Sequence, residues 1–197
     1  MSFPRSIKTH DDYKLFLKLD LAAHGLDRWR AYYRLTRPEL LFQRTLRAAE
    51  YYQTKKGLGQ IVYYWNRLLL KRRSVQTGIT ISPGVCGPGL SIPHYGSVIM
   101  HSEVRVGAFC RIHSATNLGR YGGGAPKLGD FVYIGPGAVI YGDVAVGSHV
   151  VIGANAVVGR AVPDNSTAVG IPAKVLPDRP SAEVMPPWIR AYMPDSY

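Results

Sequence analysis

The chain has 197 residues, of which 46% are hydrophobic and 19% charged, which is typical of a globular protein and not of a disordered one. It contains no run of 18 or more apolar residues, and its polar N-terminus lacks the apolar segment of a signal peptide. We therefore expect a cytoplasmic protein without transmembrane helices. Two cysteines, Cys86 and Cys110, are too few to cross-link a fold of this size, so we expect reduced thiols.

The net charge of +11 is concentrated near the N-terminus. Residues 1–75 hold 16 of the 24 Lys and Arg residues but 6 of the 13 Asp and Glu residues. A basic surface of this kind attracts nucleic acid, anionic lipid or a phosphorylated substrate, although a solvated helix surface without a partner is an equal alternative. No nucleic-acid recognition motif accompanies the charge, so we do not expect nucleic-acid binding.

Residues 10–74 have the apolar spacing of helices. A first helix is predicted to end at Gly25. A second is predicted to begin at Pro38, with Thr36 as a candidate cap. A third spans about 58–73 and ends in a basic run, which suits the negative end of the helix dipole.

From Ile79 onward the sequence repeats every six residues. Large apolar residues recur at Leu128, Ile134, Ile140, Val146, Ile152 and Val158. Four residues after each comes a small or β-branched one, at Val132, Ala138, Val144, Val150, Ala156 and Val162. An earlier set keeps the same phase, at Ile92, Val98, Val104, Cys110 and Thr116. This period fits neither a helix nor an alternating strand, and it predicts a solenoid in which three short strands form one triangular coil.

The repeat is interrupted at 119–127, where three consecutive glycines cannot supply core side chains. We expect a loop that projects from the coils, because loops on a rigid solenoid commonly form binding surfaces. The predicted organisation is a helical region at 1–75, a solenoid domain at 76–176, and a Pro-rich tail at 177–197. The tail is expected to be extended and to pack on a neighbour or stay mobile.

Several motifs resemble the hexapeptide-repeat acyltransferases. Gly-Ile-Pro-Ala-Lys at 170–174 closes the repeat as in that family, and the segments 89–96, 126–130 and 134–138 resemble its serine acetyltransferase branch. The resemblance implies a mainly β fold, a left-handed parallel β-helix with a small helical region, that assembles as a homotrimer with active sites between subunits and uses acetyl-CoA. The short helical region is similar to that of enzymes of capsule, O-antigen and exopolysaccharide synthesis.

Acetyl transfer to a hydroxyl needs a base, an oxyanion donor and a site for CoA. His94 matches the catalytic histidine of the family, and histidine suits a base because its ordinary pKa lies near 6.5; the alternative is a surface-turn histidine. The backbone N–H of Gly119 is the candidate oxyanion donor. His113 and Tyr95 are the candidates for binding the acceptor.

For CoA, the small residues Ala138 and Ala156 are expected to leave room for the pantetheine arm. Lys174, with Arg160 as a second candidate, is expected to meet the 3′-phosphate. Ordinary coil packing and solvated surface charge are the alternatives for these residues.

The sequence differs from serine acetyltransferases beside the base and in the loop. Pro93 stands where an Asp is usual, 78–82 contains no acid, and Ala125 replaces a histidine. A backbone carbonyl, Glu103 or Asp130 of a neighbouring subunit is therefore expected to orient the base.

Because these differences remove groups that recognise an amino acid, we expect the acceptor to be a sugar hydroxyl of a glycan or glycan precursor. The alternative is serine O-acetylation for cysteine biosynthesis. A remote alternative is a metal-dependent lyase, for which His94, His101 and His113 are the candidate ligands. No metal is expected for the acyltransferase, and a trimer with an inactive site is a further alternative.

The helical region also carries many aromatic residues among its basic ones. They are Trp29, Tyr32, Tyr33, Tyr51, Tyr52, Tyr63, Tyr64 and Trp65. One interpretation is peripheral contact with the anionic inner face of a membrane. The other, favoured for most of them, is a core between helices and between subunits.

Overall fold

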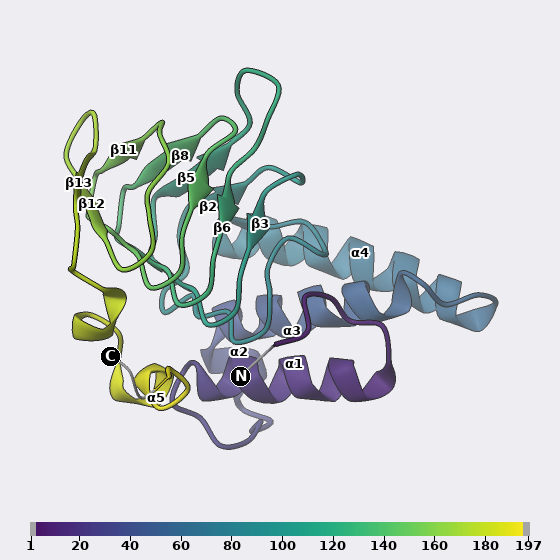
Figure 1. The fold of residues 1–197 in the computed structure, drawn as a ribbon. Helices are drawn as coiled ribbons and strands as arrows, with labels where there is room; N and C mark the ends of the chain where they lie inside the picture. Colours follow the sequence, from purple (N-terminus) through teal and green to yellow (C-terminus); the bar gives the residue numbers. More distant parts are fainter. Residues whose placement is uncertain (1–2, 195–197) are drawn as a thin grey trace.

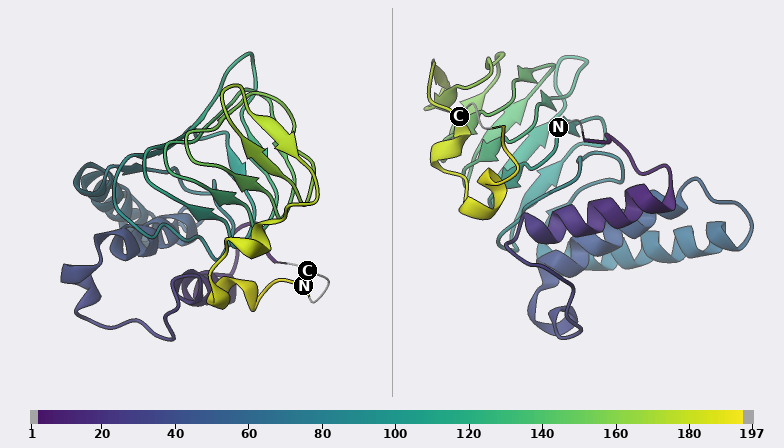
Figure 2. Two further views of the ribbon diagram at one scale, coloured as in Figure 1. Left: turned by 90° about the vertical axis from the view of Figure 1, so that its left-hand side faces the viewer. Right: turned by 60° about the horizontal axis from the view of Figure 1, so that its bottom comes forward.

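The computed structural model describes residues 3–194, and it confirms the predicted fold class: a mainly β parallel solenoid of about five turns preceded by a small helical region. The coils stack side by side, and the helices lie across one end of the stack (Figure 1). The C-terminal segment returns to the helical region, so that the two ends of the chain lie near each other (Figure 2).

Four helices form the N-terminal region: α1 (His10–Ala22), α2 (Tyr33–Thr36), α3 (Pro38–Tyr52) and α4 (Leu58–Thr77). α1 begins with a capping box, in which the Thr9 side chain accepts a hydrogen bond from the Asp12 N–H and the Asp12 carboxylate accepts one from the Thr9 N–H. Thr36 does not cap α3 as expected, because its hydroxyl donates to the Tyr32 carbonyl. No helix within residues 3–194 is both long and apolar enough to cross a bilayer.

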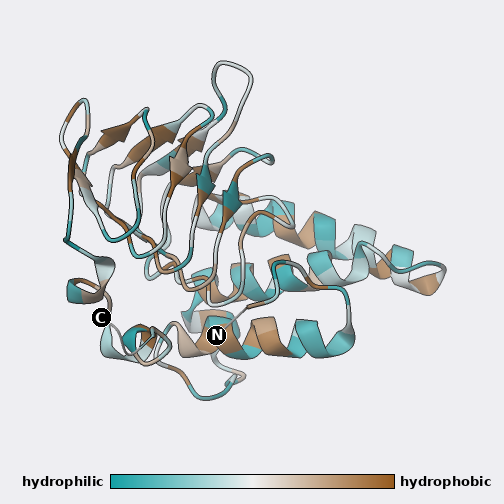
Figure 3. Cartoon of the chain, viewed as in Figure 1, coloured by the Kyte–Doolittle hydropathy of each residue, from teal (hydrophilic) through white to brown (hydrophobic). Residues whose placement is uncertain are grey.

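α3 packs against both α1 and α4 and is the most deeply buried of the helices. α4, in contrast, fully buries Leu70 and Thr77 and leaves a row of large apolar side chains in contact with solvent. Apolar residues therefore occur along α4 as well as on the strands (Figure 3).

The solenoid is built from short strands. They are β1 (Ile79–Thr80), β2 (Val98–Met100), β3 (Arg105–Val106), β4 (Arg111–Ile112), β5 (Thr116–Gly119), β6 (Lys127–Leu128), β7 (Tyr133–Ile134), β8 (Val139–Tyr141), β9 (Ala145–Val146), β10 (Val151–Ile152), β11 (Val157–Val158), β12 (Thr167–Val169) and β13 (Lys174–Leu176). They form three sheets, in the orders β1-β2-β5-β8-β11, β13-β12-β10-β7-β4 and β3-β6-β9. Every pair between named strands is parallel except β12–β13.

The strand register explains the six-residue period. Val98 pairs with Thr116 and Tyr133 with Val151, so one coil takes 18 residues, or three hexapeptides. Each repeated position therefore returns to the inside of the stack, and all of the predicted apolar and small core positions are buried there. Between Asn117 and Val139 the coil takes 22 residues, which accommodates the projecting loop.

The loop at 119–127 stands out from the coils, as expected (Figure 1). A bridge between Tyr121 and Gly124 closes its turn. Gly124 is needed at the base of the turn, because a Cβ atom there would lie 2.3 Å from Cβ of Asp143. Tyr121, at 70% exposed, projects from the loop.

The tail is neither extended nor free of its own chain. It folds into a 3-10 turn (Ser181–Glu183) and the short helix α5 (Pro187–Arg190). Ile189 and Met185 are buried in a second apolar cluster with Leu19 and Phe109, and the Trp188 indole N–H donates to the Ala23 carbonyl at 3.1 Å. Apolar burial on α1 thus overrides the open conformation that five prolines suggest. The outermost residues of the predicted end segments, 1–2 and 195–197, lie outside the described residues.

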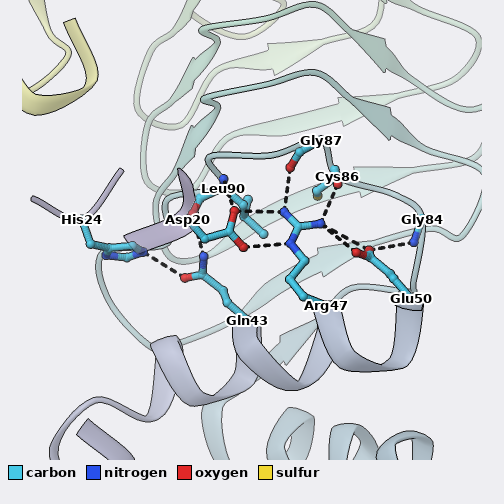
Figure 4. Close-up of polar contacts among 9 residues, drawn as sticks. All are labelled: Asp20, His24, Gln43, Arg47, Glu50, Gly84, Cys86, Gly87 and Leu90. Atoms are coloured by element: carbon cyan, nitrogen blue, oxygen red, sulfur yellow. Dashed lines mark hydrogen bonds and ion pairs between the residues drawn. The ribbon is translucent and has the colours of Figure 1, made fainter. Parts of the chain in front are cut away.

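A buried arginine joins α1 and α3 to the first coil. Arg47 is fully buried, and its guanidinium donates to both carboxylate oxygens of Asp20, at 2.8 and 3.2 Å, and to Glu50 at 3.0 Å. It also donates to the carbonyls of Cys86 at 2.8 Å and Gly87 at 2.6 Å (Figure 4). All of these acceptors lie in the interior, where an unpaired charge is costly.

The two carboxylates that flank Arg47 also reach the coil directly. Asp20 accepts from the Leu90 N–H at 3.0 Å and Glu50 from the Gly84 N–H at 2.9 Å. Beside them, the Gln43 amide donates to the Leu90 carbonyl at 2.6 Å (Figure 4). The first coil is therefore held to the helices by backbone groups that have no preceding coil with which to pair.

Replacing Arg47 tests this junction. We expect Arg47→Met to lower the free energy of unfolding by roughly 3–5 kcal/mol, because it leaves two buried carboxylates and two carbonyls without their donor. Urea unfolding followed by circular dichroism measures the change. Arg28→Met, which removes an exposed arginine paired to Asp27 at 3.9 Å, is the control and should change stability by less than about 1 kcal/mol. Equal effects of the two substitutions would contradict a structural role for the buried arginine.

Candidate active site

His94 lies on an exposed turn just before β2. The turn is fixed at Gly96, whose N–H donates to the Thr77 carbonyl at the end of α4 at 2.7 Å. Gly96 has a φ of 140°, and a Cβ atom there would lie 3.0 Å from Cβ of Ser114 on the next coil. A larger residue would push the turn off the coil, so glycine keeps His94 close to the following layer.

His113 lies one coil further along and faces His94. The two imidazole centroids are 6.3 Å apart, and the His113 ring is 5.1 Å from that of Tyr133. The Nε2 atom of His113 is buried and has no hydrogen-bond partner within residues 3–194. A buried polar atom without a partner is rare, and at this position it indicates space for a ligand atom.

The two histidines have different surroundings. Burial lowers the pKa of His113 to about 4, and the positive charges of Arg111 and His94 lower it further. His113 is therefore a neutral imidazole near pH 7, with one nitrogen that donates and one that accepts. His94, in contrast, is exposed to solvent.

Arg111 completes this cluster and was not identified from the sequence. Its guanidinium is half-buried and donates to the Ser91 hydroxyl at 2.9 Å, and within the described part of the chain it forms no ion pair with a carboxylate. Burial lowers its pKa, while Tyr133 opposes this. Arg111 and Tyr133 occupy paired positions on neighbouring coils, so the 18-residue register, applied to polar residues, is the signal that would have found them.

The remaining acceptor and oxyanion candidates lie nearby in the sequence order of the coils. Tyr95 follows His94 and is 65% exposed, with its ring in solvent. Gly119 ends β5 at the base of the projecting loop, and its carbonyl accepts from the Gly142 N–H at 3.1 Å. The roles of both residues stay predictions.

The carboxylates considered as partners of His94 are engaged elsewhere in the chain. Glu103 pairs with Arg120 at 3.4 Å. Asp130 accepts from the Ala108 N–H at 2.7 Å and from Arg5 at 3.1 Å. Among residues 3–194, no three His, Cys, Asp or Glu side chains are grouped to hold a metal ion, so the histidine set of the lyase alternative does not converge.

The CoA candidates divide into two groups. Arg160 and Lys174 are exposed and line one cavity of about 350 Å³ beside the last coil. Ala138 and Ala156 are fully buried in the solenoid core, which argues against direct contact between their methyl groups and a ligand. Their proposed part in CoA binding is limited to the shape that small residues give the coil.

Comparisons with known proteins agree with this fold. Residues 125–160 match the family model described as bacterial transferase hexapeptide (six repeats). A serine acetyltransferase from Helicobacter pylori is 39% identical over 119 residues, which are 58% of this chain and 70% of that protein. One from Synechococcus elongatus is 36% identical over 135 residues, 66% of this chain and 54% of that protein.

Solved structures give the same result. A serine acetyltransferase from Brucella abortus superposes with a TM-score of 0.69 at 28% identity, over 87% of this chain and 72% of that chain. A soybean serine acetyltransferase complexed with serine superposes with a TM-score of 0.69 at 27% identity, over 83% and 69% of the two chains.

These similarities correct one expectation from the sequence. The assignment to glycan O-acetylation, and with it polysaccharide biosynthesis, is wrong, because the relatives at 36–39% identity and the similar structures are serine acetyltransferases. The error arose from weighing the three local differences, Pro93, the acid-free segment 78–82 and Ala125, above the similarity of the whole solenoid. The chain spans 54% and 59% of the first two curated relatives, so it is shorter than either.

Proposed function

We propose that this protein, which belongs to the serine acetyltransferase family, transfers an acetyl group from acetyl-CoA to the hydroxyl of L-serine. The observation that carries the proposal is the pairing of His94, at the family's catalytic position, with the cluster of His113 and Arg111 on the next coil. The names of the relatives support serine as the acceptor.

In the proposed reaction, His94 removes the proton of the serine hydroxyl while the oxygen attacks the thioester carbonyl carbon. The N–H of Gly119 stabilises the resulting oxyanion, a contribution of about 3 kcal/mol when such a donor is well placed. The tetrahedral intermediate then collapses and breaks the C–S bond. The CoA thiolate leaves and takes the proton back from His94, so the base is regenerated.

The cluster around His113 supplies what an amino-acid acceptor needs. The guanidinium of Arg111 is a half-buried cation without a carboxylate partner, and it suits the α-carboxylate of serine. Neutral His113 presents a buried ring nitrogen without a partner, which suits the ammonium or the hydroxyl. These two residues take over the recognition that the family places at the positions of Pro93 and Ala125.

CoA is proposed to bind beside the last coil. Lys174 and Arg160 are brought to the same cavity by β13 and the end of β11, although 14 residues separate them in the sequence. Two cations that share a solvent-lined cavity suit the 3′-phosphate of CoA.

The enzyme is proposed to act as a homotrimer, and the exposed row on α4 supports contact between copies. Five apolar residues on one side of α4 are between 60% and 82% exposed: Leu58, Ile61, Trp65, Leu68 and Val75. Their spacing of three and four residues is that of a helix that packs on another helix. Peripheral membrane contact is the second candidate, because α4 carries Arg67, Lys71, Arg72 and Arg73 but no acidic residue.

The first test measures thiol release from acetyl-CoA with L-serine as the acceptor. We expect wild type to turn over and His94→Ala to lose roughly 10²–10⁴-fold in kcat. His10→Ala, which removes another exposed histidine, should keep full activity. Arg111→Met should raise the KM for serine at least about tenfold, without a matching change in the KM for acetyl-CoA. Full activity of His94→Ala would refute the base, and no turnover of serine by a wild type that binds acetyl-CoA would refute the acceptor.

A second test addresses the donor. Lys174→Gln and Arg160→Gln should each raise the KM for acetyl-CoA about 5- to 50-fold with little change in kcat, because the 3′-phosphate is remote from the reacting carbon. Dephospho-CoA, as its acetyl thioester, should be used equally well by wild type and variants. If the variants discriminate against it as strongly as against acetyl-CoA, the cavity does not hold the 3′-phosphate.

A third test addresses assembly. Light scattering of the purified protein should give three times the chain mass of 21.7 kDa. Trp65→Glu together with Leu68→Glu should shift the mass toward the monomer, because a charge in a buried helix contact is unfavourable. The matched pair Gln60→Glu with Gln76→Glu, also on α4, should leave the trimer intact. Salt-sensitive flotation with anionic vesicles by a protein that stays monomeric would favour the membrane interpretation instead.

A further inference from the structure

We propose that the helical region contains a binding pocket for a phosphate group, formed by Arg34, Arg44 and Arg73. We call it the arginine pocket. It lies among α2, α3 and α4, outside the His94 cluster, and the proposal does not depend on which acceptor the enzyme uses. The ligand class is a small phosphate ester or free phosphate.

The three arginines converge on one cavity although they are far apart in the sequence. Arg34 comes from α2, Arg44 from α3 and Arg73 from α4, and all three line a cavity of about 290 Å³. The phenol of Tyr13, from α1, lines the same cavity. The volume lies at the lower end of the range for small-molecule sites, so it suits a phosphate group and not a whole nucleotide.

No carboxylate neutralises this cluster. Elsewhere in the helical region arginines are paired: Arg47 with Asp20 and Glu50, and Arg37 with Glu39. Within residues 3–194, none of the three arginines that line the pocket forms an ion pair. Grouping like charges in a half-buried cavity opposes folding, and an anion that binds between them offsets that opposition.

The electrostatics of individual groups agree with the geometry. Burial lowers the pKa of the half-buried Arg73, and the positive charge of Arg34 lowers it further, so the two guanidiniums act on each other. Burial raises the pKa of Tyr13 while Arg44 opposes this, so the phenol stays a neutral donor beside a cation.

Two of the arginines are also held in place by the fold. Arg73 donates to the Leu41 carbonyl at 3.2 Å, and the Arg44 guanidinium lies 4.9 Å from the centre of the Trp29 ring. A planar guanidinium that is already oriented loses little entropy when it binds the oxygens of a phosphate in a bidentate manner. The pocket is therefore partly preorganised for a tetrahedral anion.

Thermal unfolding of the full chain tests the proposal with inorganic phosphate and pyrophosphate as probes, against sodium chloride at matched ionic strength. We expect the probes to raise Tm by about 5 °C at a ligand concentration near 100 times Kd. Arg34→Gln and Arg73→Gln should each lose most of this rise. Arg72→Gln, on the same helix but outside the pocket, should keep it. Arg34 is exposed, so its substitution leaves folding intact.

A signature without ligand separates this role from a structural one. In phosphate-free buffer, Arg34→Gln should unfold at the same temperature as wild type or higher, because it relieves repulsion of Arg73. A fall of Tm in that buffer, together with an unchanged response to phosphate, would show that Arg34 supports the fold and would overturn the proposal. A response no larger than that to sodium chloride would overturn it as well.

Two arms distinguish the source of the phosphate group. Isothermal titration with pyrophosphate measures soluble binding, and we expect Arg73→Gln to weaken it about tenfold or more. Co-sedimentation with phosphatidylcholine vesicles that contain phosphatidic acid measures binding to a lipid headgroup. Vesicle binding that Arg34→Gln abolishes, in a protein that does not bind pyrophosphate, would keep the pocket and assign the headgroup as its source. Vesicle binding that the same substitution leaves unchanged, again without pyrophosphate binding, would overturn the pocket.

Discussion

The contacts of Arg47 are the constraint on which the rest of the structure depends. A solenoid satisfies the backbone groups of each coil with those of the next, so the first coil needs partners from outside the repeat. Arg47, Asp20 and Glu50 supply them at Cys86, Gly87, Leu90 and Gly84. Leu90 stands four residues before His94, and Gly96 on the other side is tied to the end of α4. The position of the candidate base is thus set by the junction between helices and solenoid.

The site uses two histidines in contrasting surroundings. His94 is on an exposed turn, whereas His113 is half-buried beside Arg111, which keeps it neutral. One residue type therefore serves two different tasks, proton removal and acceptor binding, because the solvent and the neighbouring charges differ. The same coil spacing that stacks apolar residues inside the solenoid stacks Arg111 on Tyr133 outside it. Core and site follow from a single register.

Much of the fold was predictable from the sequence, because the hexapeptide period acts locally and repeats. Positions such as Ile134 and Ile152 are buried as predicted, and the three glycines of the projecting loop marked it correctly. The Arg47 network was not predictable, since its partners lie 27 to 40 residues away. Tail packing depends equally on distant contacts. For the site, His94 was found through its motif. Arg111 was missed because a cation on a strand has no motif, and the acceptor was misassigned from local differences that the neighbouring coil compensates.

One feature of the last coil bears on how the molecule remains a discrete particle. β13 runs antiparallel to β12, against the direction of every other strand pair in the solenoid. An open parallel edge would present unpaired N–H and C=O groups to another solenoid and allow growth end to end into a fibre. The reversed strand occupies that edge and changes its hydrogen-bonding pattern, while the helices cover the opposite end. Reversing one three-residue segment thereby limits polymerisation, and residues 174–176 do this next to the place where Lys174 is proposed to hold CoA.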